Sequence, residues 1–317
     1  MNIKELKENY RKTLKSSDTE ETIDLCFYRP IGYCWALIAR KLGIHPNAIT
    51  IASIFLGVGA GVMFYFDPLW MNLIGMALLI WANSFDSADG QLARLTGQYS
   101  RLGRILDGLS GDLWFLAIYI AICLREPRTS SFFEIHPWAI WVMAALAGIC
   151  HTKQAAVADL YRQFHLYFLK GKGGSELENS DELKQQLSEI PKGHFFKRII
   201  LRFYLIYTLQ QEATTPSMQK FRRLLHRYWP DGDIPQWLRE EFRAKSLPLM
   251  KYTNILTFNW RAIVLFAALF ARMPWLYFAF EITVMNGIMI YMIMKHERIC
   301  RHFTQLIEER VAEGKLN

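Results

Sequence analysis

The sequence predicts an all-α polytopic membrane protein with six transmembrane helices, an N-terminal interfacial helix and a helical cytoplasmic insertion. Two observations support this prediction. Hydrophobic residues make up 52% of the 317 residues, yet the mean hydropathy is only +0.07, so long apolar runs must alternate with polar segments. Lysine and arginine also gather in some of the polar segments and are scarce in others, as expected when a chain crosses a membrane repeatedly.

The first element lies before the apolar runs. Residues 26–41 mix aromatic side chains with cations, a composition typical of a helix that lies in the membrane interface. An ordinary amphipathic helix packed on protein is an equal alternative. The segment belongs to a cytoplasmic N-terminal region, residues 1–47.

Six apolar segments then have roughly the length needed to cross a bilayer. They are Ala48–Phe66, Met71–Asn83 running on toward Ala93, Ile105–Leu124, Pro137–Ala156, Asn259–Arg272 and Trp275–Met294. The fifth is the weakest because it is short. The domains predicted from these segments are residues 1–47, 48–156 with four spans, 157–250 as the insertion, 251–296 with two spans, and a tail at 297–317.

The insertion is predicted to be helical. Ser175 and Glu178 are spaced as a capping box for a helix toward Leu187. Residues 195–207 are apolar at helical spacing and carry three cations on the opposite face. This second helix is expected to lie on the membrane or pack on the spans, since the cations oppose crossing.

The loop charges predict an orientation. The N-terminal region, the loop between the second and third spans, the insertion and the C-terminal tail are basic, whereas the other loops are short or nearly balanced. The positive-inside rule therefore places both termini and the insertion in the cytoplasm. The expected location is an integral membrane position, in the inner membrane if the source is a bacterium.

The composition disfavours other classes of protein. The five cysteines are scattered without a paired motif, which argues against a zinc site or a disulfide framework. The net charge of +8 would suit nucleic acid, but anionic lipid headgroups account for it more simply in a membrane protein. No nucleic-acid partner is therefore expected.

An acidic motif at one end of the second and third spans carries the chemistry. If the second span stays helical, Asp86, Asp89, Gly90 and Ala93 share one face, and Arg94 lies at its edge. The small residues leave room for a flat ligand, and the guanidinium suits a phosphate. Carboxylates at membrane depth are costly and seldom idle.

The next helix repeats the pattern. Gly103 and Asp107 lie one turn apart on it, so its carboxylate is expected near the first two. A set of oxygen ligands favours Mg²⁺ or Mn²⁺ over zinc or copper.

The spacing from Asp86 to Asp107 resembles the signature of the CDP-alcohol phosphotransferases. Seven positions match over about 25 residues: Asp86, Asp89, Gly90, Ala93, Arg94, Gly103 and Asp107. Pro46, Asn47 and Thr50 also resemble a Pro-Asn-x-x-Thr segment that these enzymes carry before the first span. The resemblance covers residues 27–159 well, the last two spans by topology alone, and the insertion not at all.

The resemblance implies an enzyme of phospholipid biosynthesis. Such an enzyme transfers a substituted phosphoryl group from a CDP-linked donor, here CDP-diacylglycerol, to an alcohol and releases CMP. It also implies two divalent cations held by the aspartates, a cytidine pocket lined by Gly90, Ala93 and Gly103, Arg94 on phosphate, and a homodimer.

The sequence departs from the family at its last motif position. The family has an aspartate four residues after Asp107, as general base and metal ligand, but residue 111 is glycine and Asp112 follows. A spacing of five turns the side chain about 140° from Asp107 on a regular helix. A π-bulge near residues 108–111 would bring Asp112 back as catalytic base and metal ligand. Otherwise Asp112 is structural, or the protein is weakly catalytic.

Polar residues at the end of the fourth span suggest the identity of the acceptor. His151 and Gln154 have the spacing of a segment in phosphatidylinositol synthases, and Lys153 would suit an acceptor that carries phosphate. These residues favour inositol or inositol phosphate, and glycerol phosphate and serine stay open as acceptors. Equally, His151 and Lys153 could simply reach toward the interface.

Three alternatives stay open. One is transfer of an aminoalcohol from a soluble CDP-alcohol to a lipid acceptor. The second is a transporter whose carboxylates line an ion path. The third is a non-catalytic protein that keeps the nucleotide-binding fold.

Overall fold

The structure is a computed structural model that describes residues 8–10, 13, 14, 16, 18–99, 101–171, 177, 179–191 and 193–315. Within these residues all regular elements are helices and no strand occurs. Five helical stretches are long and apolar enough to cross a membrane: Pro46–Phe64, Leu106–Thr129, Pro137–Lys170, Gln236–Phe270 and Trp275–Ala312. The chain is thus an all-α polytopic membrane protein, as the sequence predicts.

The chain divides into two compact units. The first comprises Met1–Ala147 and Phe258–Phe280, and the second Gly148–Thr257 and Glu281–Asn317. The helices of the first unit are η1 (Asp24–Tyr28, a π-helix), α2 (Arg29–Lys41), α3 (Pro46–Phe64), α4 (Leu69–Thr96), α5 (Arg101–Thr129), α6 (Ser131–Ile135), α13 (Phe258–Phe270) and α14 (Trp275–Phe280).

The second unit holds the expected insertion and the C-terminal helix. Helix α7 (Pro137–Lys170) begins in the first unit and continues into the second. The other elements of the second unit are α8 (Ser180–Glu189), α9 (Phe195–Thr214), α10 (Pro216–Tyr228), α11 (Gln236–Ser246), η3 (Leu247–Leu249), α12 (Met250–Ile255), η4 (Glu281–Met285, a π-helix) and α15 (Asn286–Ala312).

Several expected elements are present with different ends. Helix α7 continues to Lys170, beyond residue 157, the predicted start of the insertion. A helix toward Leu187 exists as α8, but its N-cap is Asn179, whose side chain accepts a hydrogen bond from the backbone N–H of Glu182. The expected capping pair, Ser175 and Glu178, lies outside the described residues.

The second expected span is helix α4, which is 28 residues long. At 1.5 Å per residue it extends about 42 Å, enough to cross a bilayer. It is nevertheless not among the five stretches that are apolar enough to cross a membrane. Polar residues such as Asn72, Asn83 and Asp86 interrupt its apolar sequence. The structure therefore supports five spans by composition, and the sixth remains a prediction.

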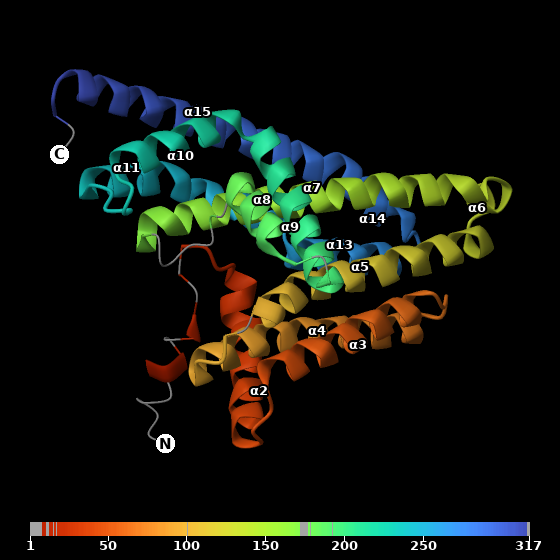
Figure 1. Ribbon diagram of the computed structural model, residues 1–317. Coiled ribbons are helices and arrows are strands. Elements are labelled where there is room, and N and C mark those ends of the chain that lie inside the picture. Colours follow the sequence, from red (N-terminus) through yellow and green to blue (C-terminus); the bar gives the residue numbers. More distant parts are fainter. Residues whose placement is uncertain are drawn as a thin grey trace. The chain divides into compact units, whose positions relative to one another are not determined.

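Helices α3, α4 and α5 lie side by side and form the frame of the first unit (Figure 1). Glycines let α3 approach both neighbours. A Cβ on Gly57 would overlap the Trp114 ring of α5, and one on Gly75 of α4 would lie 2.6 Å from the Phe64 ring. Small residues at helix contacts are typical of membrane proteins, because close backbone approach increases van der Waals contact.

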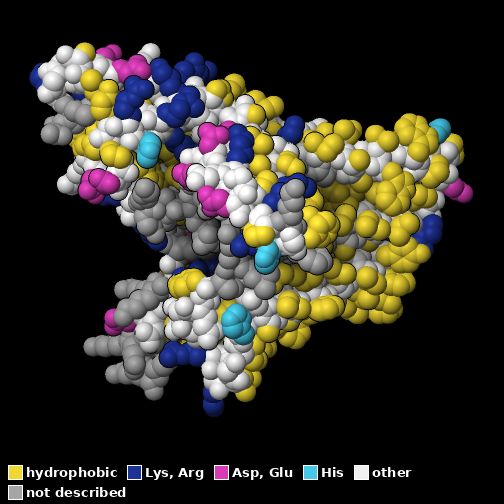
Figure 2. Space-filling view, in the orientation of Figure 1, with side chains coloured by type: hydrophobic (Ala, Val, Ile, Leu, Met, Phe, Trp, Pro, Cys, Tyr) yellow, Lys and Arg dark blue, Asp and Glu magenta, His cyan; other side chains and the backbone are white. Residues whose placement is uncertain are grey.

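Apolar side chains cover the outside of this frame. Phe55, Val62, Leu116 and Ile120 are exposed, and Figure 2 shows hydrophobic side chains over α3 and α5 at the ends farther from α2. Exposed apolar faces on helices of this length are suited to contact with lipid.

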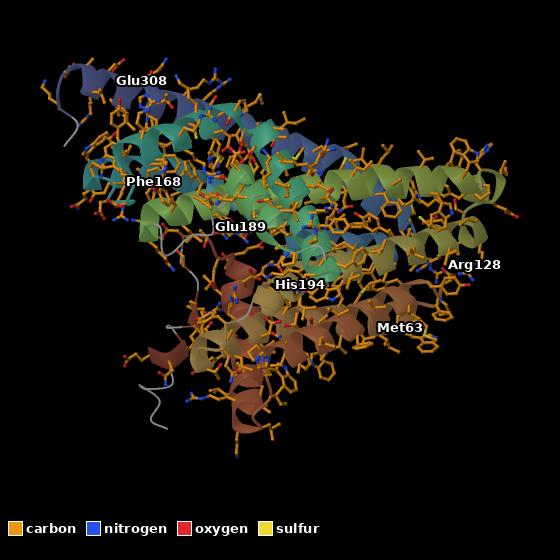
Figure 3. All side chains as sticks on the ribbon, viewed as in Figure 1. Met63, Arg128, Phe168, Glu189, His194 and Glu308 are labelled. Carbon is orange, nitrogen blue, oxygen red and sulfur yellow. The ribbon has the colours of Figure 1, made fainter. Side chains whose placement is uncertain are left out.

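A buried arginine closes the end of the frame opposite to α2. Arg125 of α5 donates hydrogen bonds to the carbonyl oxygen of Phe64 (3.1 Å), to Asn72 Oδ1 (2.9 Å) and to Asp67 Oδ1 (2.9 Å). Arg128, one turn further on, stacks on the ring of Tyr65, and its labelled side chain is visible at this end in Figure 3. These contacts fix the turn between α3 and α4 against α5.

Candidate metal and nucleotide site

Helix α4 carries the acidic motif in its last three turns. The helix runs without interruption from Leu69 to Thr96 and ends at Gly97, which has a left-handed backbone with φ of 69°. Glycine is favoured there because it has no Cβ to clash. The motif is therefore held on a regular helix, as the sequence predicts.

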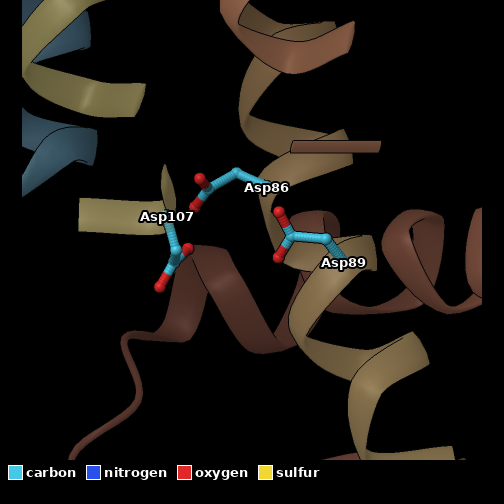
Figure 4. A group of neighbouring side chains, drawn as sticks. All are labelled: Asp86, Asp89 and Asp107. Atoms are coloured by element: carbon cyan, nitrogen blue, oxygen red, sulfur yellow. The ribbon is translucent and has the colours of Figure 1, made fainter. Parts of the chain in front are cut away.

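Three carboxylates converge at the meeting of α4 and α5. One oxygen each of Asp86, Asp89 and Asp107 lies within 4.8 Å of the others, and Figure 4 shows the three side chains pointing toward a common point. Asp89 is only 5% exposed, whereas Asp107 is open to solvent. The site is thus buried at Asp89 and open to solvent at Asp107.

Thr50 of α3 holds the buried carboxylate. Its hydroxyl donates a hydrogen bond to Asp89 Oδ2, and Thr50 itself is 2% exposed. His45 caps the start of α3 by accepting a hydrogen bond from the backbone N–H of Asn47, and Pro46 is the first residue of the helix. The segment from His45 to Thr50 thus starts α3 and places one hydroxyl against the acidic motif.

Ser110 of α5 holds the second carboxylate. Its hydroxyl lies 2.9 Å from Asp86 Oδ1 and 2.7 Å from the backbone carbonyl oxygen of Asp107, so its single hydrogen is shared between them. Because Ser110 is 1% exposed, this link is shielded from water. It ties the carboxylate of α4 to the helix that carries Asp107.

Arg94 and Gly90 lie beside the acidic group. A Cβ on Gly90 would lie 3.4 Å from Arg94 Nη1, so the guanidinium occupies the space that this glycine leaves. Arg94 Nη2 is buried and makes no hydrogen bond within the part of the chain that the structure describes. An unpaired buried N–H is costly, so an anionic ligand that accepted a hydrogen bond from it would relieve that cost.

The residues fit divalent cations. Three carboxylates so close together repel one another, and burial opposes their charge, so they must share protons or be neutralised by cations. The surrounding donors are hydroxyl and carboxylate oxygens, the ligands that Mg²⁺ and Mn²⁺ prefer.

Comparison with known proteins agrees with this geometry. The family model described as CDP-alcohol phosphatidyltransferase matches residues 43–162, which include α3, α4, α5 and most of α7. Residues 43–162 form a CDP-alcohol phosphatidyltransferase domain. The resemblance noted in the sequence motif is thereby confirmed.

A curated relative points the same way. The chain is 30% identical over 96 residues to the CDP-diacylglycerol–glycerol-3-phosphate 3-phosphatidyltransferase of Cereibacter sphaeroides. The matched region makes up 30% of this chain, and the chain spans 40% of the length of that relative. No solved structure matches the chain significantly.

One expectation within the phosphatidyltransferase domain is wrong. Helix α5 is α-helical from Arg101 to Thr129 and contains no π-bulge. Asp112 is exposed and does not belong to the group formed by Asp86, Asp89 and Asp107. A regular helix directs residue 112 about 140° away from Asp107, and no atom lies within 4 Å of a Cβ on Gly108 or Gly111. A catalytic role for Asp112 remains a prediction.

The remaining predicted residues of the domain are distributed as follows. Ala93 lies on α4 and Gly103 on α5, both partly buried. His151, Lys153 and Gln154 lie on the part of α7 that belongs to the second unit.

The expected acceptor residues belong to a buried polar network in the second unit. His151 Nδ1 lies 3.1 Å from Glu281 Oε1, and Gln154 donates to the Glu281 carbonyl oxygen (2.9 Å) and to Asn286 Oδ1 (2.8 Å). Glu281 is fully buried at the start of the π-helix η4. Lys153, by contrast, is exposed. His151 and Gln154 therefore pack inside the unit and do not simply reach toward the interface.

Two contributors to the site carry little signal in the sequence. Ser110 is marked only by lying three residues after Asp107, and Thr50 only by its place in the Pro-Asn-x-x-Thr segment. Both contacts join residues far apart in sequence or on different helices, so only the packing of α3, α4 and α5 reveals them.

Proposed function

We propose that the protein is an enzyme that transfers a phosphatidyl group from CDP-diacylglycerol to an alcohol and releases CMP. The observation that supports this most directly is the convergence of Asp86, Asp89 and Asp107 inside a CDP-alcohol phosphatidyltransferase domain. The curated relative is named as an enzyme of this type with glycerol 3-phosphate as acceptor.

In this proposal Asp86, Asp89 and Asp107 hold two divalent cations, Mg²⁺ or Mn²⁺. When bound, the cations supply neutralisation of negative charge on the diphosphate of the donor. Thr50 and Ser110 keep two of the carboxylates fixed through their hydroxyl groups. A preset ligand geometry lowers the cost of binding, because the carboxylates need not reorganise.

The donor would bind beside the carboxylates. The resemblance assigns Gly90, Ala93 and Gly103 to the cytidine pocket, and in this proposal Arg94, which lies against Gly90, meets a phosphate oxygen with its unpaired Nη2. Alignment of the acceptor hydroxyl with the donor phosphorus then supplies much of the rate, because it removes the entropy cost of bringing them together. Asp107 and Asp112, both exposed, are the candidate groups to receive the proton of the acceptor.

The acceptor is proposed to be inositol or inositol phosphate. His151 and Gln154 carry the spacing that suggests it, and Lys153 offers a cation for a phosphate. Glycerol 3-phosphate is the second candidate, because the curated relative is named for it.

We further propose that the active site faces the cytoplasm and that the protein forms a homodimer. The orientation follows from the basic loops and tails at the end of the spans that carries the acidic motif. The dimer follows from the resemblance to the family.

The test is CMP release by the purified protein in detergent with CDP-diacylglycerol and Mg²⁺ or Mn²⁺. The acceptor panel comprises inositol, inositol phosphate, glycerol 3-phosphate, serine and no acceptor. We expect CMP release that depends on one acceptor, is abolished by metal chelation and falls by about 100-fold or more in Asp89→Asn. Absence of CMP release with every acceptor and both metals would reject the proposal.

A further inference from the structure

A second face of α4 contacts the first residue of α2 and residues that precede α2. Ser87, Gln91 and Arg94 lie on this face at i, i+4 and i+7, beside the face that carries the carboxylates. Arg29 Nη1 donates to Ser87 Oγ (3.3 Å), and Gln91 Nε2 donates to the Arg29 carbonyl oxygen (3.1 Å). None of these contacts belongs to the family signature seen in the sequence.

Thr13 is the central residue of the segment before α2 that contacts α4. Arg94 Nε donates a hydrogen bond of 2.6 Å to the Thr13 carbonyl oxygen, and Gln91 Nε2 lies 3.3 Å from Thr13 Oγ1. The Thr13 hydroxyl in turn donates to the Tyr10 carbonyl oxygen (2.6 Å). Thr13 is 1% exposed although it lies near the start of the chain, so this contact is well buried.

Other contacts anchor the same segment within the first unit. The Tyr10 ring packs edge-on against Tyr33 with centroids 5.3 Å apart, and Tyr10 Oη donates to the Leu25 carbonyl oxygen (3.4 Å). Glu20 accepts a hydrogen bond from Arg29 Nε (3.2 Å). The described residues before α2 are therefore attached at several points.

The nitrogen atoms of the Arg94 guanidinium have different surroundings. Nε is bound by Thr13, whereas Nη1 lies over Gly90 and Nη2 is buried without a partner among the described residues. A guanidinium fixed at Nε can rotate little about its long side chain. Both Nη atoms lie close to Gly90, at 3.4 and 3.5 Å from its Cβ position, and Gly90 shares its helix face with Asp86. A pair of N–H donors held in this way suits bidentate contact with a phosphate.

We propose that Thr13 is a positioning residue for the donor: the N-terminal segment binds Arg94 through Nε and so orients its Nη atoms toward the diphosphate of the CDP-linked donor. This inference rests on the proposed function. It assigns to the segment before α2 a part in substrate binding, through Arg94 and without contact with the substrate. Preorganisation of a charged donor increases affinity because less side-chain entropy is lost on binding.

If the segment competed with the donor for Arg94, its effect on CDP binding would be reversed. A segment that occupies the guanidinium in competition with the donor would weaken binding, and its removal would strengthen it. Only Nε is occupied by Thr13, and the unpaired Nη2 is left for a ligand. This favours the positioning role.

The experiment measures CDP binding by calorimetry with Mg²⁺, using the full chain in detergent and variants of the segment. Thr13→Val keeps the carbonyl oxygen that binds Arg94 Nε but removes the hydroxyl whose contacts with Gln91 and Tyr10 hold that carbonyl in place. It is expected to weaken CDP binding about threefold, whereas Thr13→Ser keeps the hydroxyl and is expected to retain affinity. Removal of residues 1–14 is expected to weaken binding about tenfold. Helical circular dichroism and gel filtration check that each variant is folded.

A double-mutant cycle distinguishes positioning from a general effect on structure or charge. In an Arg94→Ala background, removal of residues 1–14 is expected to have no further effect on CDP binding, because the segment acts through Arg94. Additive effects, or tighter binding after removal, would overturn the inference while leaving the proposed function intact. Lack of CDP binding by the unaltered chain would reject the proposed function and this inference together.

Discussion

At the scale of single residues, the site depends on neutral groups that orient charged ones. Thr50 donates to Asp89, Ser110 links Asp86 to α5, and Thr13 accepts from Arg94. A buried carboxylate without such a donor would be strongly destabilising, and with several donors would lose affinity for a cation. A hydroxyl on each of Asp86 and Asp89 helps to keep these carboxylates in place.

Residue 111 offers the sharpest test at this scale. A Cβ there meets no atom within 4 Å, so Gly111→Asp should be accommodated without strain. Residue 111 lies four positions after Asp107 on a regular helix and thus on the same face. We expect Gly111→Asp to raise the affinity for Mn²⁺ by about threefold or more, measured by calorimetry, because a fourth carboxylate joins the group.

Gly108→Asp is the matched control for this variant. Gly108 also has open space around it, but it points about 100° away from Asp107 and should leave Mn²⁺ affinity unchanged. Equal affinities for the unaltered protein and Gly111→Asp would show that residue 111 is not directed toward the cluster.

At the scale of helices, glycines determine how closely α3 meets its neighbours. Gly57 and Gly61 are four residues apart on α3 and face α5. A Cβ on the first would overlap the Trp114 ring, and one on the second would lie 2.8 Å from the backbone of Ala117. Trp114 is 2% exposed and has little space into which to move. The distance between α3 and α5 matters for the site because Thr50 and Asp107 lie on these two helices.

Gly57→Ala should therefore destabilise the first unit, by about 1–3 kcal/mol, as expected for overpacking a close helix contact. Gly59→Ala is the control on the same helix, because its Cβ would make only an ordinary contact of 3.7 Å with Leu78. Thermal unfolding in detergent, followed by circular dichroism, measures both. Equal midpoints for the two variants would contradict the packing argument.

At the scale of the whole molecule, the number of spans decides the topology. Five stretches qualify by length and apolarity, and α4 is long enough but too polar to be included. If α4 also crosses, the two termini lie on the same side of the membrane. If it does not, they lie on opposite sides.

Reporter fusions test the six-span topology. A fluorescent protein fused after Asn317 should fluoresce in the cytoplasm, and alkaline phosphatase fused at Ser130, between α5 and α6, should be active outside it. A second phosphatase fusion at Gly97, after α4, should be inactive. Phosphatase activity at Gly97, or loss of fluorescence from the fusion after Asn317, would reject six spans.

Local sequence is enough to predict the membrane class, most helix positions and the acidic face of α4. These depend on composition and on the 3.6-residue period, which are independent of what the helix packs against. Periodicity predicts that Asp86 and Asp89 share a face, and the short loop between the two spans predicts that Asp107 lies at the same end of them; the structure brings the three together. The motif spacing also identifies Gly111 as the departure from the family.

The groups that support the acidic motif are defined by tertiary packing alone. Thr50 meets Asp89 across 39 residues and Thr13 meets Arg94 across 81, and neither pair has a sequence pattern of its own. The structure also shows that α5 stays regular at Gly108–Gly111, against the expected bulge, and that His151 packs against Glu281. Such contacts are set by how helices approach one another, which depends on the fit of many side chains together and cannot be read from one segment.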